Sequence, residues 1–245
     1  SYNIQSGIYT RHFGEYVTSS WKHVLPHRER VTNLDRIAGM LHGFDVVGLQ
    51  EVDSGSLRSG FIDQTEYLAH RAHFPYWYKQ VNRSLGKIAQ HSNGMLSRFR
   101  PAQISEYKLP GLPGRGALLI EFDTTDAKTL GVCILHLALG RRARRRQLAF
   151  VTELISQFPY LLLMGDFNCD CSSREFQRLV DAVNLQGLDC GMKTFPSWRP
   201  RRNLDHILAS SSLEVLEAAV VDYPLSDHLP VSMEVVLPWG VGVVT

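Results

Sequence analysis

Acidic, amide and imidazole side chains recur along the chain at the ends of apolar segments. Gln50-Glu51 follows the apolar residues 46–49, and Asp166 and Asn168 follow the apolar residues 161–164. A single carboxylate at the end of a strand usually belongs to a turn, but repeated endings of this kind need another explanation. Because side chains at strand ends can converge on one rim of an α/β protein, we expect a shared site there. The other endings are His136, Asp205-His206 and Ser226-Asp227-His228.

These side-chain types suit the hydrolysis of a phosphate ester. That reaction needs a hard cation to neutralise phosphate charge, a positioned water molecule and donors aimed at the phosphoryl oxygens. Mg²⁺ prefers oxygen ligands and keeps several waters, so one or two carboxylates are enough to hold it. Glu51 suits the metal, Asn3, Asn168 and His136 suit phosphate contact, and Asp166, Asp227 and His228 suit water activation or proton relay.

Short apolar runs alternate with helical patterns from one end of the chain to the other. Apolar residues 31, 34, 37 and 41 share one face of an expected helix, and residues 148, 151 and 155 mark a second. Ser172, with Glu175 three residues later, resembles a capping box that opens a third helix. Strands in every third of the chain, with helices between them, predict an α/β domain with enough strands for two sheets. The expected strands are 45–50, 74–81, 116–122, 130–137, 160–164, 204–209, 213–221 and 231–237.

Six segments occur in the order of the motifs of a known family. They are Tyr2-Asn3-Ile4-Gln5, Leu49-Gln50-Glu51-Val52, Leu135-His136-Leu137, Gly165-Asp166-Phe167-Asn168, Leu204-Asp205-His206-Ile207 and Ser226-Asp227-His228-Leu229-Pro230. Each segment is a weak signal alone, but the ordered set spans nearly the whole chain. In these segments the chain resembles the endonuclease/exonuclease/phosphatase superfamily, and residues 93–98 resemble a mid-domain strand of its small bacterial members.

The resemblance implies a fold and a cofactor. The fold is a four-layer α/β sandwich, in which two mixed β-sheets pack face to face and are flanked by helices, as a single domain over residues 1–245. The cofactor is Mg²⁺, for which Mn²⁺ is expected to substitute. Glu51 is the expected principal metal ligand, with Asn3 nearby and Asp227 close to the metal.

The resemblance also implies a role for each catalytic residue. Asp166 would orient or deprotonate the attacking water, and Asn168 would hold the phosphate or the water. His136 would contact a phosphate oxygen or serve the leaving group. His228, oriented by Asp205, would stabilise the transition state or act as the base. The sequence leaves the division of labour between Asp166 and His228 open.

The run Arg141-Arg142-Ala143-Arg144-Arg145-Arg146 is the least usual feature of the sequence. It follows His136 and is expected to open the helix of residues 148–155, where cations meet the positive end of the helix dipole. No acidic residue neighbours the run in sequence, so a bound anion and a solvated basic surface are equally good explanations. Arg144 shares a helical face with Leu148, which points it inward. The substrate-binding candidates are Arg141, Arg144, Arg145 and Trp198, the last of which lies in a second basic segment.

The leading hypothesis is therefore a Mg²⁺-dependent phosphodiesterase, with a lean towards a nuclease-like enzyme because of the arginines. A phosphodiesterase or phosphatase acting on a lipid or small molecule is the alternative within this fold. A third reading is a non-catalytic member that binds an anion or RNA. The formal net charge of +2 does not by itself indicate a nucleic-acid partner.

Cysteine use and hydropathy bear on the compartment. The four cysteines, Cys133, Cys169, Cys171 and Cys190, are scattered, which predicts reduced thiols in a cytoplasmic protein. No apolar run approaches the ~20 residues of a membrane span, while peripheral membrane contact and a segment ahead of Ser1 stay open. The histidines outside the motifs are expected to be surface or packing residues, namely His12, His23, His27, His42, His70, His73 and His91.

Overall fold

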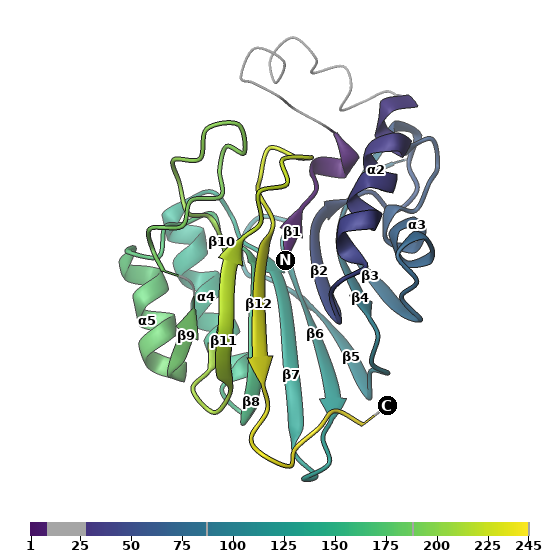
Figure 1. Cartoon of the computed structure of the whole chain (residues 1–245). Helices are drawn as coiled ribbons and strands as arrows, with labels where there is room; N and C mark the ends of the chain where they lie inside the picture. The colour runs from purple at the N-terminus through teal and green to yellow at the C-terminus, as the bar shows by residue number, and fades with distance from the viewer. Residues whose placement is uncertain (9–27, 87, 188, 245) are drawn as a thin grey trace.

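The computed structural model describes residues 1–8, 28–86, 88–187 and 189–244, and its core is a pair of β-sheets (Figure 1). The first sheet has the order β1-β2-β4-β3 and the second the order β5-β6-β7-β8-β10-β9. Both sheets are mixed, because β1 is parallel to β2 and β7 is parallel to β8, whereas the other pairs are antiparallel. The bounds are β1 Tyr2–Asn3, β2 Val46–Val52, β3 Tyr76–Leu85, β4 Ala89–Ser97, β5 Gln103–Lys108, β6 Gly116–Asp123, β7 Thr129–His136, β8 Tyr160–Asp166, β9 Leu185–Gly187 and β10 Asp205–Ser210.

Two pairs of helices cover the outer faces of the two sheets. Leu34, Ile37 and Leu68 of the first pair pack with Leu49 in one apolar cluster, and Leu148 and Phe176 of the second pair pack with β7 and β8 in another. A third cluster joins the facing sheets through Met95, Ile134 and Met164 among others. The order is therefore helix, sheet, sheet, helix, which confirms the four-layer sandwich. The helices are α2 Arg28–Leu41, α3 Gln64–Arg71, α4 Arg141–Ile155 and α5 Arg174–Val183, with short 3-10 turns at Gln5–Gly7 and Leu57–Ser59.

The hairpin of β11 (Glu214–Val220) and β12 (Val231–Val236) lies beside β1. Ser1 and Val231 exchange two backbone hydrogen bonds, so β12 continues the pairing on the side of β1 away from β2. Asp227 and His228 come just before β12. The hairpin therefore holds the last sequence motif next to the first one.

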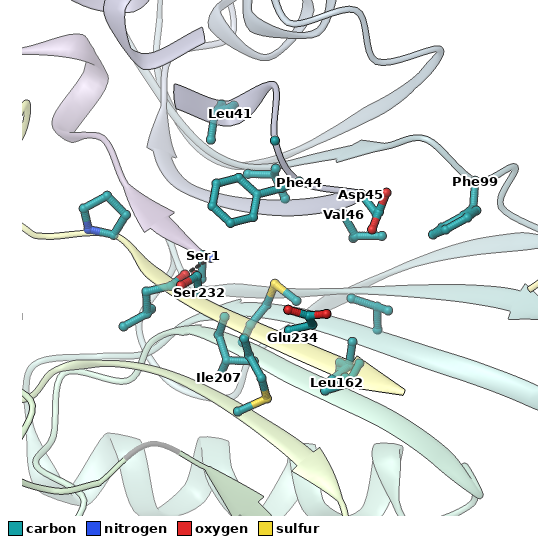
Figure 2. Close-up of a pocket in the computed structure, with 18 of the residues that line it drawn as sticks. Ser1, Leu41, Phe44, Asp45, Val46, Phe99, Leu162, Ile207, Ser232 and Glu234 are labelled. Atoms are coloured by element: carbon teal, nitrogen blue, oxygen red, sulfur yellow. Dashed lines mark hydrogen bonds between the residues drawn. The ribbon is translucent and has the colours of Figure 1, made fainter. Parts of the chain in front are cut away.

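A cavity of about 580 Å³ lies between the two sheets and under this hairpin (Figure 2). Phe44, Val46, Leu162 and Ile207 contribute apolar side chains to its wall, and Glu234 is one of its few charged residues. No residue that the sequence predicts for catalysis or metal binding is in its wall. This cavity is therefore separate from the predicted chemistry.

Two sequence expectations about the helices are wrong. Val31 is 36% exposed, because it lies at the edge of the face of α2 that Leu34, Ile37 and Leu41 bury. The capping box at Ser172 and Glu175 does not form, since Ser173 is the N-cap of α5 and its side chain makes no capping hydrogen bond. Glu175 instead turns towards Arg144 of α4, as described below.

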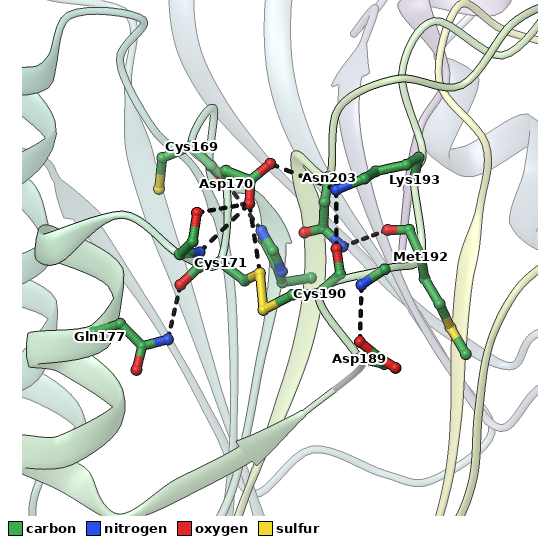
Figure 3. Close-up of a disulfide and its surroundings, with 12 residues drawn as sticks. Cys169, Asp170, Cys171, Gln177, Asp189, Cys190, Met192, Lys193 and Asn203 are labelled. Carbon is green, nitrogen blue, oxygen red and sulfur yellow. Dashed lines mark hydrogen bonds and ion pairs between the residues drawn. A yellow bond between two sulfur atoms is a disulfide. The ribbon is translucent and has the colours of Figure 1, made fainter.

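The expectation of four reduced cysteines is also wrong, because Cys171 and Cys190 form a disulfide (Figure 3). The fold brings their Cα atoms to 5.7 Å although 19 residues separate them in sequence. Cys133 and Cys169 are buried free thiols. The disulfide ties the turn after β8 to the segment that leads from β9 to β10.

Candidate active site

Three neighbouring strands of the second sheet bring the motif residues to one edge. Parallel pairing of β7 and β8 sets His136 beside Asp166, and antiparallel pairing of β10 with β8 sets Asp205 on the other side of Asp166. Gly165 makes the close approach possible, since its φ is +148° and a Cβ there would collide with the backbone of Leu135. Three of the five strand-end motifs therefore meet through sheet register alone.

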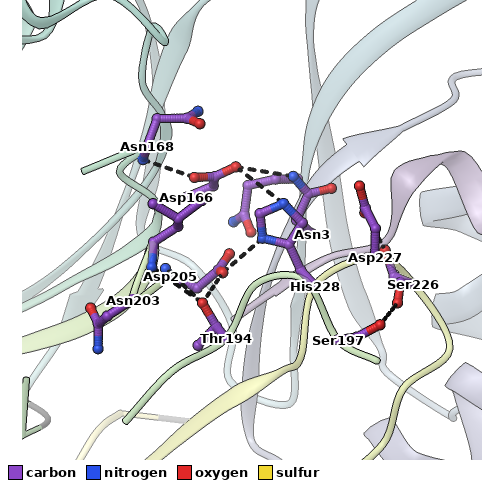
Figure 4. A network of polar contacts seen from close by, with 12 residues as sticks. Asn3, Asp166, Asn168, Thr194, Ser197, Asn203, Asp205, Ser226, Asp227 and His228 are labelled. Carbon is purple, nitrogen blue, oxygen red and sulfur yellow. Dashed lines mark hydrogen bonds and ion pairs between the residues drawn. The ribbon is translucent and has the colours of Figure 1, made fainter. Parts of the chain in front are cut away.

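Asp166 lies at the centre of the polar network (Figure 4). Its carboxylate accepts a hydrogen bond from Asn3 Nδ2 at 3.1 Å and another from the backbone N–H of Asn168 at 2.9 Å. It also lies 3.4 Å from His136 Nε2 and 4.0 Å from His228 Nε2. Burial raises the pKa of Asp166 to about 7, although the nearby His228 charge opposes that rise.

His228 and Asp205 form a buried pair next to Asp166. His228 Nδ1 lies 2.7 Å from Asp205 Oδ2, and the Thr194 hydroxyl donates to the same oxygen at 2.6 Å. Burial alone would lower the pKa of His228, but the charges of Asp205, Asp166 and Asp227 outweigh it and raise that pKa to about 10. The ring of Phe195 packs against the imidazole with 4.8 Å between centroids. His228 is therefore an imidazolium at neutral pH, held in one orientation.

His136 has the opposite character. Arg115 Nη1 lies 3.0 Å from His136 Nδ1, and a guanidinium can only donate. Nδ1 must therefore accept, which places the ring proton on Nε2, the atom that faces Asp166. Burial, followed by the Arg115 charge, lowers the pKa of His136 well below its ordinary value. His136 is thus a neutral donor, while its neighbour His228 is charged.

Glu51 reaches the site from the first sheet. A register shift between Leu49 and Val52 and a φ of +56° at Glu51 turn this residue out of the β2 ladder. Its carboxylate stays about one-third exposed and lies 4.0 Å from His136 Nε2. Asp227 lies on another side, where burial is the main cause that raises its pKa to about 6. The network thus has carboxylates on several sides.

This donor set fits a hard divalent cation. Asp166 and Asp205 offer carboxylate oxygens that lie, together with a ring nitrogen of His228, within 4.8 Å of one another, and the buried Asp205 Oδ1 has no hydrogen-bond partner. Burial, with smaller contributions from neighbouring carboxylates, raises the pKa values of Asp166 and Asp227, and a bound cation would favour their ionised forms. Asn3 is already engaged, since its amide donates to Asp166 and its Oδ1 accepts from the backbone N–H of Gln5.

Two residues near the site were missed by sequence reasoning. Arg115 precedes β6 in a Gly-Arg-Gly segment that carries no distinctive signal, yet its guanidinium contacts His136 and interacts with the charges of Glu51 and Asp166. His91, expected as a surface or packing residue, contributes to the lowered pKa of His136, and its Nε2 lies 3.4 Å from Arg58 Nη1. His12, His23 and His27 lie outside the described residues.

Arg144, a predicted substrate-binding residue, contacts a carboxylate of the protein itself. It is buried, donates to Leu139 O, and forms an ion pair with Glu175 Oε1 at 3.1 Å. Arg141 lies 3.5 Å from the other Glu175 oxygen, so the arginine run does have an acidic neighbour, which α5 supplies. Arg145 is exposed and Trp198 is half-buried. The inward arginine therefore joins α4 to α5 through its contact with Glu175.

Removing Glu175 should destabilise the fold without touching the site. Glu175→Ala leaves the buried Arg144 guanidinium without its counterion, so we expect the free energy of unfolding to fall by about 3–5 kcal/mol. Arg145→Ala on the exposed face of the same helix is the control, with a change within about 0.5 kcal/mol. Urea titration of both variants measures the difference. Equal stability of the two variants would mean that the ion pair contributes nothing.

Comparison with known proteins places this geometry in a family. The model of the endonuclease/exonuclease/phosphatase family matches residues 1–228. The chain belongs to the endonuclease/exonuclease/phosphatase family. Members of this family are hydrolases that act on phosphate esters. The match spans every residue discussed above, from Asn3 to His228.

Individual relatives are more distant. The Escherichia coli K12 protein YbhP, itself uncharacterised, is 30% identical over 160 residues, which cover 59% of this chain and 62% of YbhP. A family member from Bacteroides thetaiotaomicron has a TM-score of 0.74 at 18% identity and covers 98% of this chain and 94% of its own. A mannosyl-6-phosphatase from the same organism has a TM-score of 0.70 at 17% identity, covering 94% and 97%. These two structures share the fold. None of the helices within the described ranges has the length and apolar composition of a membrane span.

Proposed function

We propose that this protein is a Mg²⁺-dependent phosphodiesterase in which Asp166 activates the attacking water. The observation that carries the proposal is the buried set of Asp166, Asp205 and His228, with Glu51 and the neutral His136 facing it. Glu51 and Asp227 would hold the cation, with Asn3 nearby and orienting Asp166. The cation would neutralise phosphate charge and lower the pKa of a bound water. A binding protein without turnover would not need this arrangement of acid, base and donor groups.

The protonation states support separate roles for the two central residues. A carboxylate with a pKa of about 7 is well matched to accept a proton from water near neutral pH, so we assign the base to Asp166. His228 holds its proton at that pH and cannot serve as the base, so we assign it to the phosphoryl oxygens as a charged donor. Asp205 and Thr194 keep it oriented. His136 Nε2–H and Asn168 complete the donors.

The arginines near the site bear on the class of phosphate ester. Arg115 stands beside His136 and suits a non-bridging phosphate oxygen. The nuclease-like reading rested largely on the arginine run, and Arg144 and Arg141 are occupied with Glu175 instead. The arginine run therefore gives less support to a nucleic-acid substrate, and we propose lipid and small-molecule phosphodiesters equally as substrates. A sugar phosphomonoester stays in the panel, because a structural neighbour is a mannosyl-6-phosphatase.

A substrate panel with an inactive variant tests the proposal. The panel contains plasmid DNA, RNA, a phospholipid, a sugar phosphate and bis(p-nitrophenyl) phosphate, each with Mg²⁺. His228→Ala should lower turnover of any substrate that the protein cleaves by about 10²–10³-fold while the circular dichroism spectrum is kept, because the variant loses a preorganised charged donor. Asp170→Asn, on the same rim but outside the polar network, should keep its activity. Turnover by His228→Ala at the level of the unmodified protein would refute the assignment.

The disulfide bears on the compartment in which the protein works. The cytoplasmic expectation rested on reduced cysteines, whereas Cys171 and Cys190 are joined. Disulfides persist in oxidising compartments, so we propose that the protein works in one. Alkylation of acid-quenched cells should leave Cys171 and Cys190 unmodified. Labelling of both would restore the cytoplasmic assignment.

A further inference from the structure

Two loops that flank the site expose large apolar side chains. Loop 109–115 connects β5 to β6 and presents Leu112, which is 85% exposed, and loop 137–140 connects β7 to α4 and presents Leu139, which is 76% exposed. Single exposed leucines are ordinary on protein surfaces. The first loop ends at Arg115, which contacts His136, and the second loop follows His136 directly, so both loops adjoin the site.

The two loops are fixed to each other and to the site. The buried side chain of Gln147 accepts a hydrogen bond from Ala138 N at 2.8 Å and donates to Pro110 O at 3.3 Å, so it joins the loops. Arg115 ends the first loop at His136 Nδ1, and Asn168 Nδ2 donates to Leu137 O at the start of the second. A surface in contact with these leucines would therefore lie directly over the polar network.

A basic surface adjoins the same edge. Because β7 and β8 are parallel, α4 and α5, which follow them, both begin at the edge that carries His136 and Asp166. Within the described residues, no ion pair engages five exposed arginines of these helices, namely Arg142, Arg145, Arg146, Arg174 and Arg178. Glu175 is paired with Arg141 and Arg144, so it does not neutralise the five exposed arginines.

We propose that this rim, made of Leu112, Leu139 and the arginines at the start of α4 and α5, docks on an anionic phospholipid surface. Arginines next to protruding leucines match a bilayer, where anionic headgroups meet acyl chains. A nucleic-acid strand would instead be served by aromatic rings on which bases stack, and loops 109–115 and 137–140 carry none. This inference rests on the proposed function: a phosphodiesterase that docks in this way would act on a phospholipid phosphodiester.

Vesicle sedimentation in EDTA tests the docking apart from catalysis. The unmodified protein should pellet with vesicles of equal parts phosphatidylcholine and phosphatidylglycerol, and not with phosphatidylcholine alone. Leu112→Ser with Leu139→Ser should abolish pelleting. Arg142→Gln with Arg146→Gln should weaken it about 25-fold, because each basic residue near an anionic bilayer contributes roughly fivefold.

Matched variants at the opposite edge keep the test specific. Trp239→Ser removes a fully exposed apolar side chain beyond the far end of β12, and Arg100→Gln with Lys128→Gln removes two charges at the far ends of β4 and β7. Both should pellet like the unmodified protein. Pelleting by the leucine variant, or equal weakening by the rim and control variants, would overturn the proposal. So would binding to duplex DNA without binding to vesicles. Bis(p-nitrophenyl) phosphate hydrolysis, followed in parallel with Mg²⁺, tests the proposed function separately and should be equal in all these variants.

Discussion

Asp166→Asn should lower kcat/KM for a phosphodiester by about 10²–10⁴-fold, the contribution typical of a positioned general base. Asn has nearly the same shape but cannot accept the proton of the attacking water or supply a charge to a cation. The effect should be among the largest of any single substitution, because Asp166 touches Asn3 and Asn168 and lies beside both site histidines. Steady-state kinetics on a chromogenic phosphodiester measure it.

The stability of the same variant separates a catalytic role from a structural one. Burial raises the pKa of Asp166 to about 7, so its ionised form is disfavoured in the metal-free folded state. A neutral Asn removes that penalty, and the midpoint of thermal unfolding in EDTA at about pH 8 should not fall. Asp170→Asn is the control, with kinetics and stability close to those of the unmodified protein. An inactive Asp166→Asn protein that also unfolds at a much lower temperature would show that Asp166 serves the fold.

Chelation should abolish hydrolysis, and Mg²⁺ or Mn²⁺ should restore it. The cation neutralises a site in which Glu51, Asp166, Asp205 and Asp227 would otherwise face one another, so its loss removes both charge balance and water activation. Activity in EDTA, followed by titration with each ion, measures the effect. Undiminished turnover in EDTA would end the metal hypothesis.

The stabilisation by Mg²⁺ should grow with pH. The folded-state pKa values of about 7 for Asp166 and about 6 for Asp227 lie above their unfolded values, so the metal-free folded state binds protons more tightly and loses stability as the pH rises towards 7. The raised pKa of His228, about 10, adds stability below its ordinary value that is lost as the pH rises through 10. A cation competes with the carboxylate protons, so its thermal shift should be large near pH 8 and small near pH 5. Glu51→Gln should shrink the shift at pH 8, and a shift independent of pH would contradict this linkage.

Much of the architecture could be predicted from local patterns. Apolar runs with polar residues at one end mark β2, β7, β8 and β10 within a few residues, because strand burial depends on side chains that are near in sequence. The register of those strands then carried His136, Asp166 and Asp205 to one edge. Residue types at strand ends therefore indicated both the family and the place of the site.

Other features depend on which surfaces meet, and only the tertiary structure decided them. Arg144 has the same helical spacing whether it binds a phosphate or a carboxylate, and α5 supplied Glu175 from 31 residues away. Arg115 and the disulfide between Cys171 and Cys190 have the same origin in long-range contact. The protonation of His136 and His228 was likewise beyond the sequence, since both are buried imidazoles, and an arginine faces Nδ1 of the first whereas an aspartate faces Nδ1 of the second. Charge at a buried site is set by neighbours in space, and periodicity along the chain carries no record of them.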